Sequence, residues 1–300
     1  MRYLHLDVFT DTPFEGNQLA VYPEPPFDIS TERMQRIAQE MNFSETTFVF
    51  PKQGPGDVKM RIFTPGTELP MAGHPTIGTT FALAMEGAIA AGRKEFVFEL
   101  GVGPISVALE WKGRDLSFAW MTQPIPSFGA GIEDRDAFAA AVGVEPGDLG
   151  ETPVQSVSAG VPFLFVPIKS RAAVDRVTID LRSLNRLVKE AAIEQTGVFF
   201  FTADRTGAES DETVYSRMLA PGFGIAEDPA TGIASGPLGC YLLHYGLVTA
   251  QQARSMISLQ GAKMKRPSRV YISIDSENDR LSRVRVGGQA VMVAEGKLVV

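Results

Sequence analysis

The sequence has very few of the side chains that bind transition metals or form disulfides. Its 300 residues contain one cysteine, Cys240, and three histidines, His5, His74 and His244. A single thiol excludes a disulfide within the chain, and these four residues cannot be assembled into a Cys/His zinc pattern. Cys240 stands among apolar residues and is predicted to be an inert core thiol. A metal site built from carboxylates is left open by this composition.

Long apolar runs and an excess of positive charge are also missing. No stretch approaches the roughly 18 consecutive apolar residues of a membrane span, and Asp7 stands where a signal peptide would carry its apolar core. The 28 lysines and arginines against 35 aspartates and glutamates give a net charge of −7, whereas a protein that wraps nucleic acid needs a basic surface. We therefore expect a cytoplasmic protein that binds neither membranes nor nucleic acid.

Composition and patterning predict two domains of α+β structure. A chain with 44% hydrophobic and 21% charged side chains is long enough for two cores, at roughly 100 to 200 residues per domain. Short apolar or alternating segments, separated by glycine and proline, predict mostly antiparallel strands. The expected strands are 4–9, 19–22, 47–51, 58–63, 96–100, 105–111, 116–121 and 198–202.

Helical spacing is confined to a few segments. Apolar residues at i, i+3, i+4 and i+7 predict an amphipathic helix over 30–41 with Ser30 as its N-cap. Two further segments are apolar on all sides: one opens at Pro75, and the other opens at Pro229 and should be kinked or interrupted at Pro237. A helix of this kind in a soluble protein is normally buried, so both should lie inside sheets. Two outer helices are expected around 134–142 and 181–192.

The two halves contain a weak internal repeat. The first copy reads R-I-F-T-P-G-T-E-L-P-M-A-G-H-P-T-I-G from Arg61, and the second reads R-M-L-A-P-G-F-G-I-A-E-D-P-A-T-G from Arg217. Aligning them matches His74-Pro75 with Asp228-Pro229. A predicted strand precedes each copy and an apolar helix follows it, which favours a duplicated α+β unit.

The aligned turns provide two candidate site residues, His74 and Asp228. If each X-Pro step opens a helix, residue X lies outside the helix with its side chain free to enter a cleft between the halves. Helix N-termini offer unpaired N–H groups and a positive dipole end, which suit an anionic small molecule such as a carboxylate. The dipole would also keep His74 neutral. The alternative is that His74 and Asp228 each cap their own helix.

Glu45 is the candidate acid/base. It precedes an apolar strand in N-F-S-E-T-T-F-V-F, and that strand leads through a hairpin to the His74 turn. A partly desolvated carboxyl there could carry a proton both ways, and the alternative is a surface carboxylate. Glu68 is a competing acid that we interpret as positional. The sequence contains no P-loop, Rossmann or nucleophile-elbow motif.

At these residues the sequence resembles the phenazine-biosynthesis isomerase-like (PhzF-like) family, which has the diaminopimelate epimerase-like fold. The resemblance implies two pseudo-symmetric domains, each a mostly antiparallel sheet rolled around a central apolar helix. With it we place the N-terminal domain at 1–118, joined by a returning strand at about 288–300, and the C-terminal domain at 119–287. The matching segments are D-V-F-T-D-T-P-F-E-G-N-Q-L-A-V from Asp7, N-F-S-E-T-T-F-V from Asn42, both repeat segments, and G-G-Q-A-V-M-V-A-E-G-K-L from Gly287.

The resemblance also implies a function. Glu45 would remove a proton from one carbon of a small, usually cyclic, amino- or hydroxy-carboxylate and return it to another. His74 and Asp228 would bind and orient this substrate, and Gly73 would contribute backbone. The family's pattern implies an isomerase that needs no metal or organic cofactor and that forms a homodimer.

One departure from the family's pattern bears on the substrate. The family usually has a serine where this sequence has Ile233. A substrate polar group that loses such a partner is left unpaired, which typically costs ~1–3 kcal/mol and argues against the phenazine precursor itself. Two alternatives therefore stand beside the isomerase: a noncatalytic protein that binds a small carboxylate or a partner on the same fold, and an epimerase that works with carboxylates.

Overall fold

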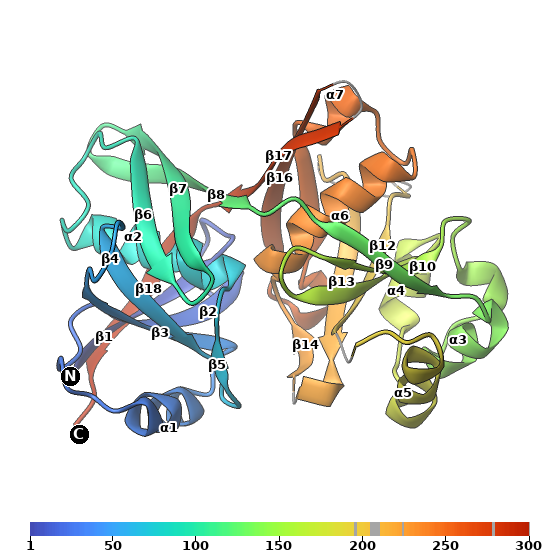
Figure 1. The fold of residues 1–300 in the computed structure, drawn as a ribbon, viewed down its shortest axis with the longest axis horizontal. Helices are drawn as coiled ribbons and strands as arrows, with labels where there is room; N and C mark the ends of the chain where they lie inside the picture. Colours follow the sequence, from blue (N-terminus) through green and yellow to red (C-terminus); the bar gives the residue numbers. More distant parts are fainter. Residues whose placement is uncertain (195–196, 205–210, 224, 278–279, 300) are drawn as a thin grey trace. The chain divides into compact units, whose positions relative to one another are not determined.

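The computed structural model of the chain describes residues 1–194, 197–204, 211–223, 225–277 and 280–299. The chain folds into two compact units (Figure 1). Unit 1 consists of Met1–Thr122 and Arg285–Val300, and unit 2 consists of Gln123–Val284. Unit 1 is therefore built from both ends of the chain.

The strands of unit 1 are β1 (Arg2–Val8), β2 (Asn17–Tyr22), β3 (Glu45–Pro51), β4 (Val58–Phe63), β5 (Glu68–Leu69), β6 (Glu95–Leu100), β7 (Gly103–Lys112), β8 (Asp115–Gln123) and β18 (Ala290–Lys297). They pair in the order β18, β1, β2, β3, β4, β6, β7, β8, and β5 adds a short ladder to β4. Only the β2–β3 and β4–β6 pairs among these are parallel. The last strand of the chain thus lies beside the first (Figure 1).

The sheet of unit 1 packs around helix α2 (Gly73–Met85). This helix contacts β1, β2, β3 and β18, and its residues from Gly73 to Leu83 are all buried. The prediction of a buried apolar helix is therefore confirmed. The predicted start at Pro75 is wrong, because the helix begins two residues earlier, at Gly73. His74 is therefore the second residue of the helix. Proline is tolerated there since first-turn N–H groups have no partner within the helix.

Helix α1 (Thr31–Met41) covers another face of unit 1. Ser30 caps it as predicted, with its hydroxyl accepting a hydrogen bond from Arg33 N over 3.2 Å. Its apolar side, including Met34 and Ile37, packs with aromatic side chains of β2, β3 and β4. The helix thus joins a small core of its own between α1 and the strands.

Unit 2 contains β9 (Ser127–Ile132), β10 (Val154–Ser158), β11 (Pro162–Pro167), β12 (Gly197–Thr202), β13 (Val214–Ala220), β14 (Ile225–Asp228), β15 (Met256–Gln260) and β16 (Ser268–Glu277), and β17 (Arg280–Gly288) runs from it into unit 1. The pairs β9–β10, β10–β11, β12–β13 and β15–β16 are antiparallel, whereas β11–β12 and β13–β15 are parallel. Short β14 pairs with β13 as β5 pairs with β4. The order and directions of the strands repeat those of unit 1, which supports the duplicated unit inferred from the sequence.

Helix α6 (Gly232–His244) is the counterpart of α2. It contacts β10, β11 and β16 and is buried from Gly232 to Leu242. The helix runs through Pro237 without a break, so the interruption expected at this residue is not observed. The prediction that it opens at Pro229 is wrong. Asp228 pairs with Met218 at the end of β14, and a residue before proline favours extended backbone, so the strand continues to that point.

The helix starts change the alignment of the two halves. Both helices have 13 residues and begin with glycine, Gly73 in α2 and Gly232 in α6. Their second residues are His74 and Ile233. Matched by helix position, His74 therefore corresponds to Ile233 and not to Asp228, which lies four residues before its helix.

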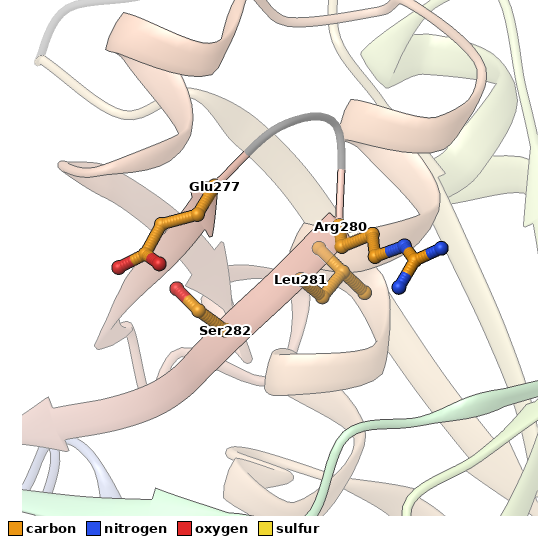
Figure 2. Close-up of a pocket in the computed structure, with 4 residues that line it drawn as sticks. All are labelled: Glu277, Arg280, Leu281 and Ser282. Atoms are coloured by element: carbon orange, nitrogen blue, oxygen red, sulfur yellow. The ribbon is translucent and has the colours of Figure 1, made fainter.

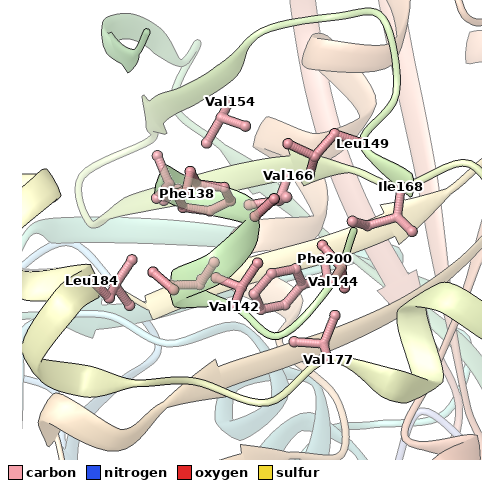
Figure 3. Close-up of a cluster of buried hydrophobic side chains, with 14 of the residues drawn as sticks. Phe138, Val142, Val144, Leu149, Val154, Val166, Ile168, Val177, Leu184 and Phe200 are labelled. Atoms are coloured by element: carbon pink, nitrogen blue, oxygen red, sulfur yellow. The ribbon is translucent and has the colours of Figure 1, made fainter. Parts of the chain in front are cut away.

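The outer helices of unit 2 enclose a second apolar core. Phe138 and Val142 at α3, Leu184 of α5 and Phe200 of β12 meet in it (Figure 3). Helices α4 and α7 were not predicted because they are too short to show apolar periodicity. The bounds are α3 (Arg135–Ala141), α4 (Arg171–Arg176), α5 (Leu181–Glu190) and α7 (Ala250–Ala253), with 3₁₀ turns at Pro146–Asp148, Pro221–Phe223 and Ala262–Met264.

In the part of the chain that the structure describes, none of the helices is both long enough and apolar enough to cross a membrane.

The close packing of α2 predicts the effect of a small substitution. A Cβ atom on Gly78 would lie 2.5 Å from Leu19 Cδ2 and 2.6 Å from Val8 Cγ2. Overpacking of this kind costs ~1–3 kcal/mol, against a helix-propensity gain of about 1 kcal/mol. We expect Gly78→Ala to lower the free energy of unfolding in urea. The control is Gly147→Ala, where no atom lies within 4 Å of the added Cβ, and an equal effect in both variants would contradict the packing argument.

Candidate functional site

The turn between β1 and β2 fixes the start of β2. Gly16 has φ +66°, and a Cβ there would lie 2.4 Å from Val8 O, so only glycine fits this position. The buried carboxylate of Asp7 accepts a hydrogen bond from Phe14 N over 2.7 Å, and Phe14 itself has φ +72°. These contacts determine where Asn17, the first residue of β2, enters the sheet.

Three polar side chains of unit 1 converge beside this turn. Glu45 is the first residue of β3 and is paired with Leu19 in the parallel β2–β3 ladder. Its Oε2 atom lies 3.2 Å from Nδ1 of His74 in the first turn of α2. Asn17 Nδ2 lies 3.3 Å from the same nitrogen. We call Asn17, Glu45 and His74 the polar cluster.

The polar cluster is largely withdrawn from solvent. The His74 side chain is 3% exposed, and the Glu45 side chain is 14% exposed. Burial lowers the pKa of His74 to about 3, so the imidazole is neutral at neutral pH. The sequence analysis expected a neutral His74 because of the helix dipole, but the cause is desolvation. His74 Nε2 is also buried and has no hydrogen-bond partner among the described residues.

The geometry decides between several alternatives left open by the sequence. The N-cap of α2 is Ala72, so His74 does not cap its helix. Glu45 contacts His74 and is not a surface carboxylate. Glu68 instead binds Arg61 through two hydrogen bonds of 2.6 and 2.7 Å, which gives it the positional role we expected. Gly73 is the first, buried residue of α2, where backbone N–H groups have no partner within the helix.

The other predicted site residues, Asp228 and Ile233, belong to unit 2. Asp228 is buried, and its Oδ2 accepts a hydrogen bond from the Thr231 hydroxyl over 2.5 Å. Thr231, not Asp228, is the N-cap residue of α6, so the capping alternative for Asp228 is also wrong. Ile233 is buried in the first turn of that helix.

A fully buried glutamine holds the Asp228 loop. Gln260, at the end of β15, accepts a hydrogen bond from Thr231 N over 3.0 Å. Its Nε2 donates to Asp228 O over 2.8 Å and to the Thr231 hydroxyl over 3.0 Å. One amide side chain therefore fixes both the backbone and the hydroxyl that position the Asp228 carboxyl.

The sequence analysis missed Asn17, Thr231 and Gln260. Asn17 and Gln260 are polar residues at the ends of otherwise apolar strands, which is the only signal that the sequence contains for them. A single sequence does not reveal which of its many polar strand ends contact another polar side chain. Their contacts depend on pairing between distant segments.

The described part of the chain shows no metal site. Its His, Cys, Asp and Glu side chains form no group of three or more that could hold a metal ion. A hollow at the ends of β16 and β17 is lined by Glu277, Arg280, Leu281 and Ser282 (Figure 2). Glu277 and Ser282 point toward one another there, whereas Arg280 points away. The hollow offers one carboxylate and none of the predicted site residues.

The polar cluster has the chemical means to move a proton. A carboxyl group can donate and accept a proton, and it touches a neutral imidazole that can do the same through either nitrogen. Exclusion from water strengthens the hydrogen bonds that such groups make with a ligand. The arrangement therefore suits general acid/base chemistry on a small polar molecule.

Comparison with known proteins relates this arrangement to a family. Residues 6–296 match the family described as phenazine biosynthesis-like protein (PhzC-PhzF). A Pseudomonas aeruginosa relative, trans-2,3-dihydro-3-hydroxyanthranilate isomerase, is 35% identical over 297 residues, covering 99% of this chain and 98% of the relative. A Bacillus anthracis structure described as a phenazine biosynthesis protein of the PhzF family is 26% identical, with a TM-score of 0.88, and the match covers 100% of this chain and 99% of that one.

A more distant structural neighbour has a different activity in its name. A hydroxyproline epimerase from Agrobacterium vitis is 15% identical, with a TM-score of 0.62, and the match covers 99% of this chain and 91% of that one. At this identity the likeness concerns the fold alone. Together the neighbours confirm the predicted α+β fold of the epimerase-like class.

The lowered pKa of His74 predicts a pH dependence of stability. Between pH about 3 and 6.5 the unfolded chain binds a proton on this histidine that the folded chain does not. The free energy of unfolding should therefore fall as the pH drops through this window, by up to ~1.4 kcal/mol per pH unit from this group. Urea unfolding between pH 7 and 4 should show a shallower fall for His74→Gln, and equal slopes would contradict the burial of a neutral ring.

The role of Gln260 predicts a loss of stability on its removal. Gln260→Leu would leave Thr231 N and Asp228 O without their buried partner, and each such group costs ~1–3 kcal/mol. We expect the free energy of unfolding to fall by at least ~2 kcal/mol. The matched control is Gln251→Leu at an exposed position, expected within about 0.5 kcal/mol of the parent. Similar losses in both variants would mean that the Gln260 amide does not hold the loop.

Proposed function

The chain belongs to the phenazine biosynthesis-like family, and from this premise we propose that it is an isomerase that moves a proton within a small carboxylate. The observation that carries the proposal is the contact of 3.2 Å between the Glu45 carboxyl and the buried His74 ring. In the proposed reaction, Glu45 removes a proton from one carbon of a conjugated system and returns it to another. No atom or electron is gained or lost overall, so the residues present need no cofactor or metal for this chemistry.

Each residue of the polar cluster has a role in this proposal. Glu45 is the general acid/base, and one carboxyl can make both transfers if the two carbons present the same face. The neutral His74 ring binds a polar group of the substrate and stabilises charge that develops during proton transfer. The buried start of α2 at Gly73 would add backbone N–H groups that favour an anionic substrate.

The residues of unit 2 are proposed to define the substrate. Asp228, whose carboxyl is held by Thr231, would bind a polar substrate group. Ile233 presents no hydroxyl where the family's pattern usually has a serine. A substrate that needed this hydroxyl would bind less well by ~1–3 kcal/mol. We therefore propose a cyclic amino- or hydroxy-carboxylate that is apolar where it meets Ile233.

A racemase that uses two thiols does not fit these residues. The only cysteine of the chain, Cys240, is buried inside α6, and burial raises the pKa of its thiol to about 12. An inert thiol of this kind cannot exchange protons with a substrate near neutral pH. The carboxyl of Glu45 is the better-placed acid/base.

Proton NMR in heavy water tests the catalytic proposal. The first substrate is trans-2,3-dihydro-3-hydroxyanthranilate, which the name of the Pseudomonas aeruginosa relative suggests. Conversion should be accompanied by deuterium entering the product, and Glu45→Gln should lower the rate by ~10²- to 10⁴-fold. Glu68→Gln is the matched control and should keep the parent rate, since Glu68 binds Arg61. Full turnover by Glu45→Gln would refute the role of Glu45.

The same assay distinguishes the alternatives at Ile233 and Asp228. Conversion by Ile233→Ser but not by the parent protein would mean that the acid/base is intact and that the parent protein acts on another substrate. Asp228→Asn, which keeps the shape of the side chain, should raise KM for any converted substrate. Binding of cyclic carboxylates without hydrogen exchange, unchanged by Glu45→Gln, would instead favour a noncatalytic binding protein. Loss of optical purity without movement of a double bond would indicate an epimerase.

A further inference from the structure

We propose that Gln260 and Thr231 are positioning residues that hold the Asp228 carboxyl in its ionised form, so that Asp228 binds a donor group of the substrate without exchanging protons with it. The binding of substrate by Asp228 rests on the proposed function. The direction of the hydrogen bonds around Asp228 does not, because it can be measured without a substrate.

The first step is the orientation of the Gln260 amide, which follows from its two backbone partners. A backbone N–H can only donate and a carbonyl oxygen can only accept. The atom of Gln260 that faces Thr231 N over 3.0 Å is therefore the oxygen, and the atom that faces Asp228 O over 2.8 Å is the nitrogen. Turning the amide around would place two donors and two acceptors against each other in a fully buried position.

The second step is the direction of the Thr231 hydroxyl. Gln260 Nε2 also lies 3.0 Å from Thr231 Oγ1, and an NH₂ group can only donate, so the hydroxyl oxygen accepts this hydrogen bond. The hydroxyl has one hydrogen of its own, and the other partner of Thr231 Oγ1 is Asp228 Oδ2 at 2.5 Å. Because a buried hydroxyl hydrogen without an acceptor costs free energy, this hydrogen points to Asp228.

The third step is the consequence for Asp228. A proton on Oδ2 would compete with the hydrogen of the Thr231 hydroxyl for the same space, and a hydrogen bond to the ionised form of a carboxyl favours that form. An ionised carboxyl only accepts, so the substrate group that it binds has to be a donor, such as an amino or hydroxyl group. It has no proton to give to a carbon atom, which leaves Glu45 as the acid/base of the proposed reaction.

The counterparts of these three polar residues in unit 1 are apolar. They follow from the matched ladders β4–β5 and β13–β14, from the N-caps of α2 and α6, and from the matched ladders β4–β6 and β13–β15. In the order Asp228, Thr231 and Gln260, they are Leu69, Ala72 and Leu100. The same sequence of strand, proline and buried helix thus forms in unit 1 without the polar groups. Their presence in unit 2 alone supports a role at the site.

Carbon NMR of protein labelled with ¹³C at the aspartate side-chain carboxyl tests the proposal at neutral pH. Asp228→Asn identifies the resonance of Asp228, because this one signal disappears from the spectrum. In the parent protein we expect the chemical shift of an ionised carboxyl. The shift of a protonated carboxyl would overturn the proposal without any variant of Thr231 or Gln260.

Thr231→Val removes the hydroxyl and keeps the shape of the side chain. One oxygen of Asp228 then loses its donor, so the carboxyl resonance should move, whereas Thr231→Ser retains a hydroxyl and should leave it near the parent position. The matched control is Thr80→Val, the same change at a buried helix residue whose hydroxyl donates to Thr76 O over 2.7 Å. An unmoved Asp228 resonance in a folded Thr231→Val protein would overturn the proposal.

Gln260→Glu tests whether the amide determines the direction of the Thr231 hydroxyl. The new carboxylate has no hydrogen to donate, so the hydroxyl can turn toward it, and the Asp228 resonance should move as it does in Thr231→Val. The matched control is Gln251→Glu, the same change at an exposed position, which should leave the resonance in place. If Gln260→Glu folds and behaves like this control, the role of Gln260 is refuted.

Kinetics separate this inference from the proposed function. An asparagine cannot exchange a proton, so Asp228→Asn should raise KM but lower kcat by less than the ~10²-fold typical of a lost acid/base. Thr231→Val should also raise KM, and combining it with Asp228→Asn should raise KM no further, because Thr231 acts through Asp228. A loss of kcat as large as that of Glu45→Gln would show that Asp228 exchanges protons. If the NMR results are as expected but Glu45→Gln retains full turnover, the proposed function fails and the hydrogen-bond directions stand.

Discussion

Helix α2 is buried along nearly its whole length, and the chemistry of the polar cluster depends on this burial. Strands β1, β2, β3 and β18 surround the helix, so a side chain in its first turn is removed from water as the sheet forms. The His74 ring stays neutral there at neutral pH, because its pKa is lowered to about 3. A neutral ring can then donate through one nitrogen and accept through the other, which an exposed and partly protonated histidine would not do reliably.

The two units show what the duplicated fold conserves and what it changes. Each carries an arginine that binds a glutamate through two hydrogen bonds, Arg61 with Glu68 and Arg217 with Glu227, at 2.6 to 2.9 Å. These pairs join the corresponding strands β4–β5 and β13–β14, so they belong to the shared scaffold. The second residue of the buried helix is different, His74 in one unit and Ile233 in the other. The fold is thus repeated while the reactive position is not.

Much of this architecture could be predicted from the sequence. The apolar residues around Thr79 and Leu242 predict buried helices because no charged side chain interrupts them, and Ser30 marks the start of α1 through ordinary capping chemistry. The helix starts could not be predicted in the same way. Proline favours the first turn but fits several positions in it, so Pro75 and Pro229 do not fix where their helices begin. For Pro229 the outcome depends on pairing of Asp228 with β13, which lies outside the local sequence.

The candidate site could also be predicted only in part from the sequence. Glu45 and His74 could be identified from motifs that carry a resemblance, whereas Asn17 and Gln260 act through contacts that only the folded chain reveals. Both are amides, and the reason is physical. A buried charge costs solvation energy, which a neutral side chain avoids. An amide can hold neighbouring polar groups without adding a charge, as Gln260 does for Thr231 N and Asp228 O.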